Sequence, residues 1–130
     1  MTWVYKSKIF ARFARKARIS DADLWKAVRL AEDGGVDADL GGGVIKQRIA
    51  RAGQGKSGGS RSIILFRKGD RAVFVYGFEK KDRSNIDTDD LLLFRNMARE
   101  ILEYSVAEME FAVEMGEFVK VVAPEEENRG

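Results

Sequence analysis

The spacing of the apolar residues changes at Val44, and this change limits the folds that the chain can adopt. Before residue 36 the apolar residues recur at helical spacing in two segments, 8–17 and 20–33. From Val44 the spacing is two residues, so that Ile45 and Ile49 share one face of a strand. The pattern predicts an α+β fold, with two N-terminal helices packed on a small twisted antiparallel sheet.

Three strands are expected in succession as an antiparallel meander. The first begins at Val44, and the second, 61–68, contains the apolar run Ile63–Phe66, which is typical of a central strand covered on both faces. A tight turn at 68–71 leads to the third strand, 72–78. Residues 3–6 are expected to form a short first strand and 36–43 a loop.

The C-terminal third is expected to add helices to this sheet. Asp87 or Thr88 caps a third helix, and Ser105 with Glu108 forms the capping box of a fourth, just as Ser20 and Asp23 cap the second. Residues 118–122 are expected to form a last short strand or an extended arm. We therefore predict one domain over residues 1–123 and a disordered acidic tail over residues 124–130.

Composition argues against several classes of enzyme. The 130 residues include no histidine and no cysteine, so the commonest metal ligands and the commonest general base near neutral pH are missing. A zinc enzyme or a Ser–His–Asp hydrolase is not expected, and neither is a cofactor. No apolar run approaches the roughly 18 residues of a membrane span, and no signal peptide precedes the first strand. We expect a cytoplasmic protein without a membrane partner.

Charge is distributed unevenly along the chain. Residues 1–83 carry 19 Lys or Arg against 9 Asp or Glu, whereas residues 84–130 carry 4 against 12. A basic body beside an acidic C-terminal third predicts a surface that binds a polyanion. Ordinary solvated charge is the alternative.

A glycine-rich basic loop connects the first two strands of the meander. Residues 50–57 match the relaxed phosphate-binding pattern A-x-x-x-x-G-K-S, but that loop requires a helix directly after it. Here a strand is expected instead, so nucleoside triphosphate binding is not predicted. Alternation puts Lys46 and Arg48 side by side on the open face of their strand, close to Arg61 at the start of the next. These cations suit a phosphodiester backbone.

Three motif blocks resemble a known family. K-x-R-I-A-R (46–51), G-x-G-K-S-G-G-x-R (53–61) and Y-G-F-x-K-x-x-R (76–83) are similar to HigB-like toxins of type II toxin–antitoxin systems, in the RelE/ParE superfamily. The resemblance implies a metal-independent endoribonuclease that cleaves mRNA on the ribosome. It also implies a cognate antitoxin as partner, often one with a helix-turn-helix DNA-binding domain.

The resemblance also implies roles for individual residues. Lys46 and Arg48 match strand cations that contact RNA, Arg61 matches the arginine that stabilises the scissile phosphate, and Lys81 matches a further catalytic cation. Further RNA contacts are expected from Arg51, Lys56, Lys80 and Arg83. Where RelE itself has a tyrosine shortly after this last loop, the present chain has Asp87, while Tyr76 is expected on a different strand.

The chemistry requires no histidine. The ribose 2′-hydroxyl can attack the adjacent phosphate in line while cations stabilise the charge that develops. Neighbouring positive charges favour the neutral, proton-accepting form of a lysine amine, which makes Lys46 the candidate general base. Two other functions stay open: inhibition of DNA gyrase, as in ParE-like relatives, and nucleic-acid binding without catalysis.

Overall fold

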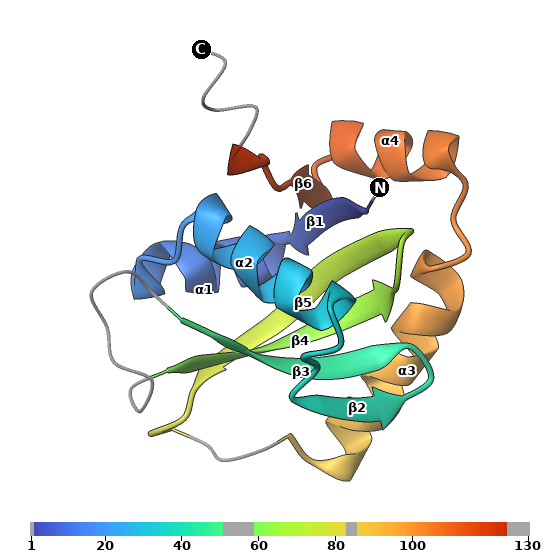
Figure 1. The fold of residues 1–130 in the computed structure, drawn as a ribbon. Coiled ribbons are helices and arrows are strands. Elements are labelled where there is room, and N and C mark those ends of the chain that lie inside the picture. Colours follow the sequence, from blue (N-terminus) through green and yellow to red (C-terminus); the bar gives the residue numbers. More distant parts are fainter. Residues whose placement is uncertain (1, 51–58, 83–85, 125–130) are drawn as a thin grey trace.

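The computed structural model describes residues 2–50, 59–82 and 86–124. Its elements follow the order β1 (Trp3–Ser7), α1 (Lys8–Ala17), α2 (Asp21–Glu32), β2 (Ala38–Gly41), β3 (Val44–Ile49), β4 (Ser60–Arg67), β5 (Arg71–Glu79), α3 (Thr88–Ile101), α4 (Val106–Glu114) and β6 (Phe118–Lys120) (Figure 1). The predicted α+β class is confirmed. Of the predicted tail, only Pro124 lies among the described residues.

Side-chain caps begin each of the four described helices. The Ser7 hydroxyl accepts a hydrogen bond from the backbone N–H of Phe10 at 3.1 Å, which starts α1. Ser20 and Ser105 form the predicted capping boxes of α2 and α4, and Asp87 caps α3. These contacts satisfy N–H groups that a helix leaves unpaired in its first turn, so the helix starts follow from local sequence.

The six strands form one sheet in the order β2-β3-β4-β5-β1-β6. The predicted antiparallel meander of β3, β4 and β5 is confirmed. The prediction of a purely antiparallel sheet is wrong, because β1 pairs with β5 in parallel. Val4 and Tyr5 point to opposite faces of β1 and are both buried, so burial of apolar surface on both faces favours this inserted position.

Residues 36–43 are not entirely loop, which corrects a second prediction. Ala38–Gly41 forms β2 and pairs with β3, and Gly41, Gly42 and Gly43 connect the two strands with positive φ angles. Glycine adopts this conformation without steric cost. Ala38 and Leu40 do alternate with Asp39 and Gly41 in this short edge strand, but a segment of aspartates and glycines is also typical of a turn.

Helices cover both faces of the sheet, and each face has its own core. On the α1/α2 face, Phe10 and Leu24 pack against Ile45, Ile64 and Phe74. The opposite, α3/α4 face has its own set of buried side chains, including Val44, Ile63, Leu65, Phe94, Ile101 and Met109. The two N-terminal helices therefore cover one face as predicted, and the C-terminal helices cover part of the other.

Candidate functional site

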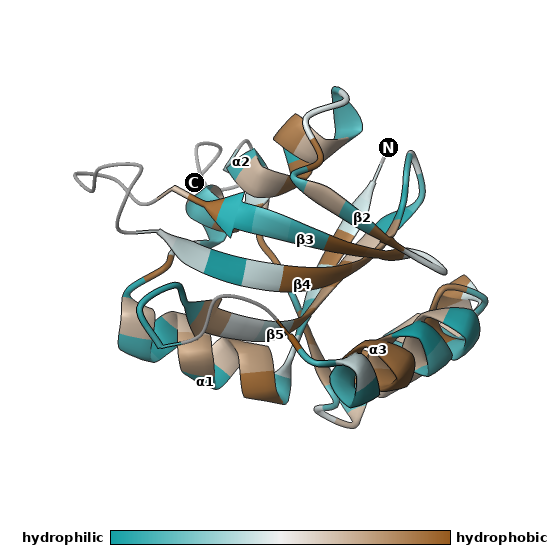
Figure 2. Cartoon of the chain, turned by 90° about the horizontal axis from the view of Figure 1, so that it is seen from below, coloured by the Kyte–Doolittle hydropathy of each residue, from teal (hydrophilic) through white to brown (hydrophobic). Residues whose placement is uncertain are grey.

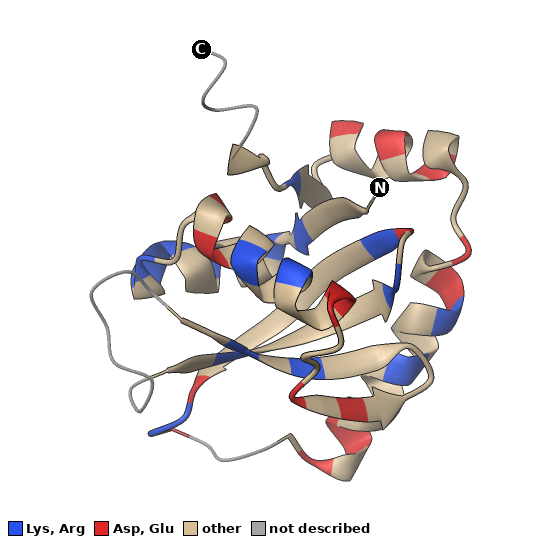
Figure 3. Ribbon diagram, in the orientation of Figure 1, with Lys and Arg blue, Asp and Glu red and all other residues tan. Residues whose placement is uncertain are grey.

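Pairing of β3 with β4 aligns the basic residues that the sequence singles out. Arg48 lies directly opposite Arg61, and Lys46 lies opposite Ile63, two residues away on the same face. Directly opposed side chains in such a ladder have Cβ atoms about 4.5–5.5 Å apart. The structure therefore brings Lys46, Arg48 and Arg61 together on the α3/α4 face. Figure 3 draws the lysine and arginine positions of the chain in blue, including those on β3.

The sequence suggested that this face of β3 is open, but only part of its length is exposed. Val44 is fully buried beneath the C-terminal helices, Lys46 is half-buried and Arg48 is exposed. Figure 2 shows β3 as hydrophobic at its start beside α3 and hydrophilic over most of its remaining length. The cations thus lie where the sheet emerges from its helical cover.

Arg61 has an unsatisfied group at this boundary. Its side chain is half-buried, and its Nη1 atom is buried with no hydrogen-bond partner among the described residues. A buried donor without a partner typically costs about 1–3 kcal/mol. An anion bound at this position would remove that cost, because a guanidinium suits the geometry of phosphate oxygens.

Arg48 is held differently, by a carboxylate from the segment before β2. Asp37 accepts a hydrogen bond from the Arg48 backbone N–H at 2.6 Å. Its other oxygen lies 3.6 Å from Nη2 of the same arginine. The Asp37 N–H in turn donates to the Gln47 side-chain oxygen at 2.9 Å. The Gln47 amide is buried and donates to the carbonyls of Ala27 and Gly35, so a buried polar contact fixes the carboxylate beside Arg48.

An aromatic cluster of Tyr76, Phe78 and Phe94 lies beside the cations. Ile63 pairs with Tyr76 and Ile64 with Phe74, so β5 has one extra residue at this point. This bulge turns Tyr76 toward the α3/α4 face, where its ring lies 5.8 Å from Phe94 and 6.1 Å from Phe78 between centroids. Tyr76 therefore shares a row with Lys46 across Ile63.

The residue after Tyr76 gives a sequence signal for this bulge. Gly77 interrupts an otherwise apolar strand, and glycine inside a strand often marks a bulge or a close approach. A Cβ atom at Gly77 would lie 2.2 Å from Cδ2 of Phe13. Strict two-residue alternation did not predict that Tyr76 faces the cations, whereas Gly77 could have indicated the bulge that turns it there.

The remaining predicted site residues follow β5. Lys80 and Lys81 are exposed in the turn directly after this strand. Glu79, the last residue of β5, pairs with Ser60, the residue before Arg61, so the turn lies at the same end of the sheet as Arg61. Arg51, Lys56 and Arg83 lie outside the described residues. A strand begins at Ser60, as expected, where a nucleotide-binding loop would require a helix.

The described part of the chain contains neither a cluster of metal ligands nor a membrane-spanning helix. Within residues 2–50, 59–82 and 86–124, no three Asp or Glu side chains are grouped so that they could hold a metal ion. No helix of these segments has the length and hydropathy of a membrane span.

Comparison with protein families gives a match over nearly the whole chain. The family model described as "RelE toxin of RelE / RelB toxin-antitoxin system" matches residues 2–121. No curated protein matches the chain. The matched range includes every strand and helix described above.

Proposed function

Because the chain belongs to the RelE toxin family of RelE/RelB toxin–antitoxin systems, we propose that it is a metal-independent endoribonuclease that cleaves mRNA. Its substrate is mRNA on the ribosome, and its cognate antitoxin has a helix-turn-helix DNA-binding domain. The three motif blocks that contain Lys46, Arg61 and Tyr76 favour the HigB-like branch of the superfamily.

The observation that carries this proposal is the juxtaposition of Arg48 and Arg61 beside Lys46. Like charges directly opposite each other destabilise a sheet, and the Arg61 Nη1 has no partner among the described residues. Phosphate oxygens would neutralise both arginines and supply the missing acceptor. Lys80 and Lys81, in the turn after β5, extend the same cationic surface toward the flanking backbone.

The reaction is an in-line transfer at phosphorus. The 2′-oxygen forms a bond to the adjacent phosphorus while the bond to the 5′-oxygen breaks, which leaves a 2′,3′-cyclic phosphate and a 5′-hydroxyl. Arg61 stabilises the charge on the phosphate oxygens, and Lys81 stabilises charge on the leaving oxygen. Lys46 accepts the 2′-hydroxyl proton, and a water molecule donates a proton to the 5′-oxygen as it leaves.

Tyr76 takes a supporting role in this proposal. Its ring belongs to the aromatic cluster with Phe78 and Phe94, in the same row as Lys46. Aromatic side chains stack on exposed bases, with a typical contribution of about 1–3 kcal/mol per base. Tyr76 thereby orients the nucleotide whose 2′-hydroxyl attacks.

Primer extension on mRNA from cells that produce the toxin tests this function. The wild type is expected to arrest growth and to generate discrete cleavage ends, whereas Arg61→Ala is expected to do neither. A gyrase supercoiling assay with the same proteins separates the ParE-like alternative. Inhibited gyrase with intact mRNA would reject the nuclease, and RNA binding without cleavage ends would leave only a nucleic-acid-binding module.

A further inference from the structure

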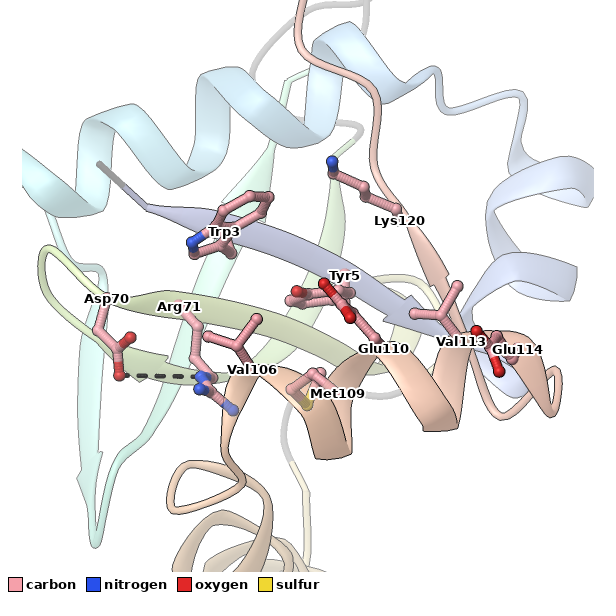
Figure 4. Close-up of a pocket in the computed structure, with 10 residues that line it drawn as sticks. All are labelled: Trp3, Tyr5, Asp70, Arg71, Val106, Met109, Glu110, Val113, Glu114 and Lys120. Carbon is pink, nitrogen blue, oxygen red and sulfur yellow. Dashed lines mark ion pairs between the residues drawn. The ribbon is translucent and has the colours of Figure 1, made fainter.

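A concave surface lies between β1 and α4, away from the strand cations. It is a cavity of about 370 Å³ with Trp3 and Tyr5 from β1 on one side and Met109 and Val113 from α4 on the other (Figure 4). Trp3 retains 43% of its accessible surface and Val106, at the start of α4, 61%. Exposed apolar side chains grouped around a hollow are typical of a binding surface.

The cations beside this cavity are already engaged within the protein. Arg71 donates from Nη1 to the carbonyl of Ile101 at 3.0 Å and from Nη2 to that of Tyr104 at 2.8 Å. The Lys120 ammonium lies 4.8 Å from the centroid of the Trp3 ring. An anionic ligand would have to compete with these contacts, so the cavity is poorly suited to a phosphate or a carboxylate.

The carboxylates on the opposite wall are available. Glu110 and Glu114 project from the exposed side of α4 and line the cavity (Figure 4). Neither forms an ion pair with another of the residues that the structure describes. Their spacing of four residues puts them on one helical face, one turn apart. The free polar groups of this surface are therefore negative, and its interior is apolar.

We propose that this surface anchors the antitoxin through an amphipathic segment that carries an apolar side chain flanked by lysine or arginine. The apolar side chain fills the cavity between Tyr5 and Met109, and the basic side chains pair with Glu110 and Glu114. The inference rests on the toxin–antitoxin assignment for the existence of such a partner. The negative charges of Glu110 and Glu114 favour a basic segment of the partner and would repel an acidic one.

The anchor is remote from the proposed RNA site. The cavity lies at the Arg71 end of β5, and Arg61 pairs with Phe78 near its other end. Seven residues of strand span about 23 Å. An antitoxin segment at α4 therefore leaves the cations of β3 and β4 uncovered, and weakening this anchor should not alter the activity of the free toxin.

The test measures the affinity of purified toxin for its antitoxin by titration calorimetry, without RNA. In the double variant Glu110→Lys/Glu114→Lys, the dissociation constant is expected to rise at least tenfold. Val106→Lys, a single change at an exposed position, should also weaken binding. Glu117→Lys is the matched control, because Glu117 lines a separate hollow with Phe111, and it should change the constant less than threefold.

Three results would overturn the proposal. If the double variant bound the antitoxin with wild-type affinity, the antitoxin would not bind at this surface. If Glu117→Lys lost as much affinity as the double variant, the loss would come from the net charge of the toxin and not from this surface. The third result concerns the oligomeric state of the free toxin, measured by sedimentation. If the wild type were a dimer and the double variant a monomer, the surface would bind a second copy of the chain. RNA cleavage by each free variant is measured separately, so a failure of the nuclease proposal leaves this test intact.

Discussion

Arg48 on β3 and Arg61 on β4 lie directly opposite each other in the antiparallel ladder. Among residues 2–50, 59–82 and 86–124, a carboxylate compensates this like-charge pair on one side only, where Asp37 lies 3.6 Å from the Arg48 guanidinium. Arg61 retains a buried Nη1 without a partner among the described residues. An RNA phosphate would therefore compete with Asp37 at Arg48, whereas at Arg61 it would supply a missing hydrogen-bond acceptor.

Removal of either strand cation should lower the salt dependence of RNA binding. Each phosphate contact contributes about 0.7 to the slope of log affinity against log salt concentration on single strands. Lys46→Ala and Arg48→Ala should each reduce the slope by about that amount, as measured by fluorescence anisotropy with a labelled RNA. Lys68→Ala, at the exposed turn before β5, should leave the slope unchanged. Equal slopes in all four proteins would mean that RNA binds elsewhere.

Neutralising Asp37 should tighten RNA binding. Asp37→Asn retains a carbonyl oxygen for the Arg48 backbone N–H but removes the negative charge beside its guanidinium. Partly exposed ion pairs contribute about 0.2–1 kcal/mol, so the affinity at low salt should rise about 1.5- to 5-fold. Asp39→Asn is the matched control, because the Asp39 carboxylate accepts only the local Gly41 N–H at 2.9 Å in the described structure. A similar gain in both variants would indicate a general charge effect.

Gln47 should be important for stability, although it lies between two proposed RNA contacts. Its buried amide donates to the carbonyls of Ala27 and Gly35, at 3.3 and 3.0 Å, and accepts from Asp37. Gln47→Leu leaves these groups unpaired and should lower the free energy of unfolding by about 1–3 kcal/mol. Urea denaturation measures this change. A variant as stable as the wild type would show that water replaces the amide.

Stability should fall at high pH partly through Tyr5. Burial raises the pKa of its phenol, against the opposing effect of Arg71. Below the unfolded-state pKa of about 10 the phenol is neutral in both states, and its contribution to stability is fully present. Above that pH the unfolded chain ionises first, so stability is lost as pH rises toward the folded-state pKa.

The Tyr5 contribution is measured in a Tyr104→Phe background. Burial also raises the pKa of Tyr104, whose hydroxyl donates to Glu100, so this residue would add to the same slope. Urea denaturation between pH 9 and about 11 should show a shallower decline when Tyr5→Phe is added. An unchanged decline would mean that other groups cause the loss.

Much of the local structure could be predicted from the sequence, because its causes are local. Ser20, Asp87 and Ser105 cap helices through hydrogen bonds that span three residues, and Ile63–Phe66 indicates a strand covered on both faces. The parallel pairing of β1 with β5 could not be predicted in this way, because it joins Trp3 to Arg71 across the whole meander. Strand β2 was missed because its four residues are too few to distinguish alternation from the aspartates and glycines of a turn.

The same division applies to the candidate site. Alternation along β3 predicted the shared face of Lys46 and Arg48, and the register of β4 adds Arg61 to it. Tyr76 was assigned to a separate strand and not to the site, because the bulge in β5 depends on pairing with Ile63 and Ile64. Asp37 lies in the segment 36–43 that was expected to be a loop, and its contact with Arg48 could not be predicted because it follows from tertiary packing around Gln47.

The most direct test of the nuclease is the single-turnover cleavage rate of mRNA on programmed ribosomes, for the wild type and for Arg61→Ala. Loss of one group that stabilises transition-state charge typically costs about 10²–10³-fold in rate. We predict a decrease of that size, with a melting temperature no lower than that of the wild type, because Arg61→Ala removes a buried unpaired donor and a like-charge pair, and with a 2′,3′-cyclic phosphate on the wild-type product. A folded Arg61→Ala protein that cleaves at the wild-type rate would contradict the proposed role of Arg61 at the scissile phosphate.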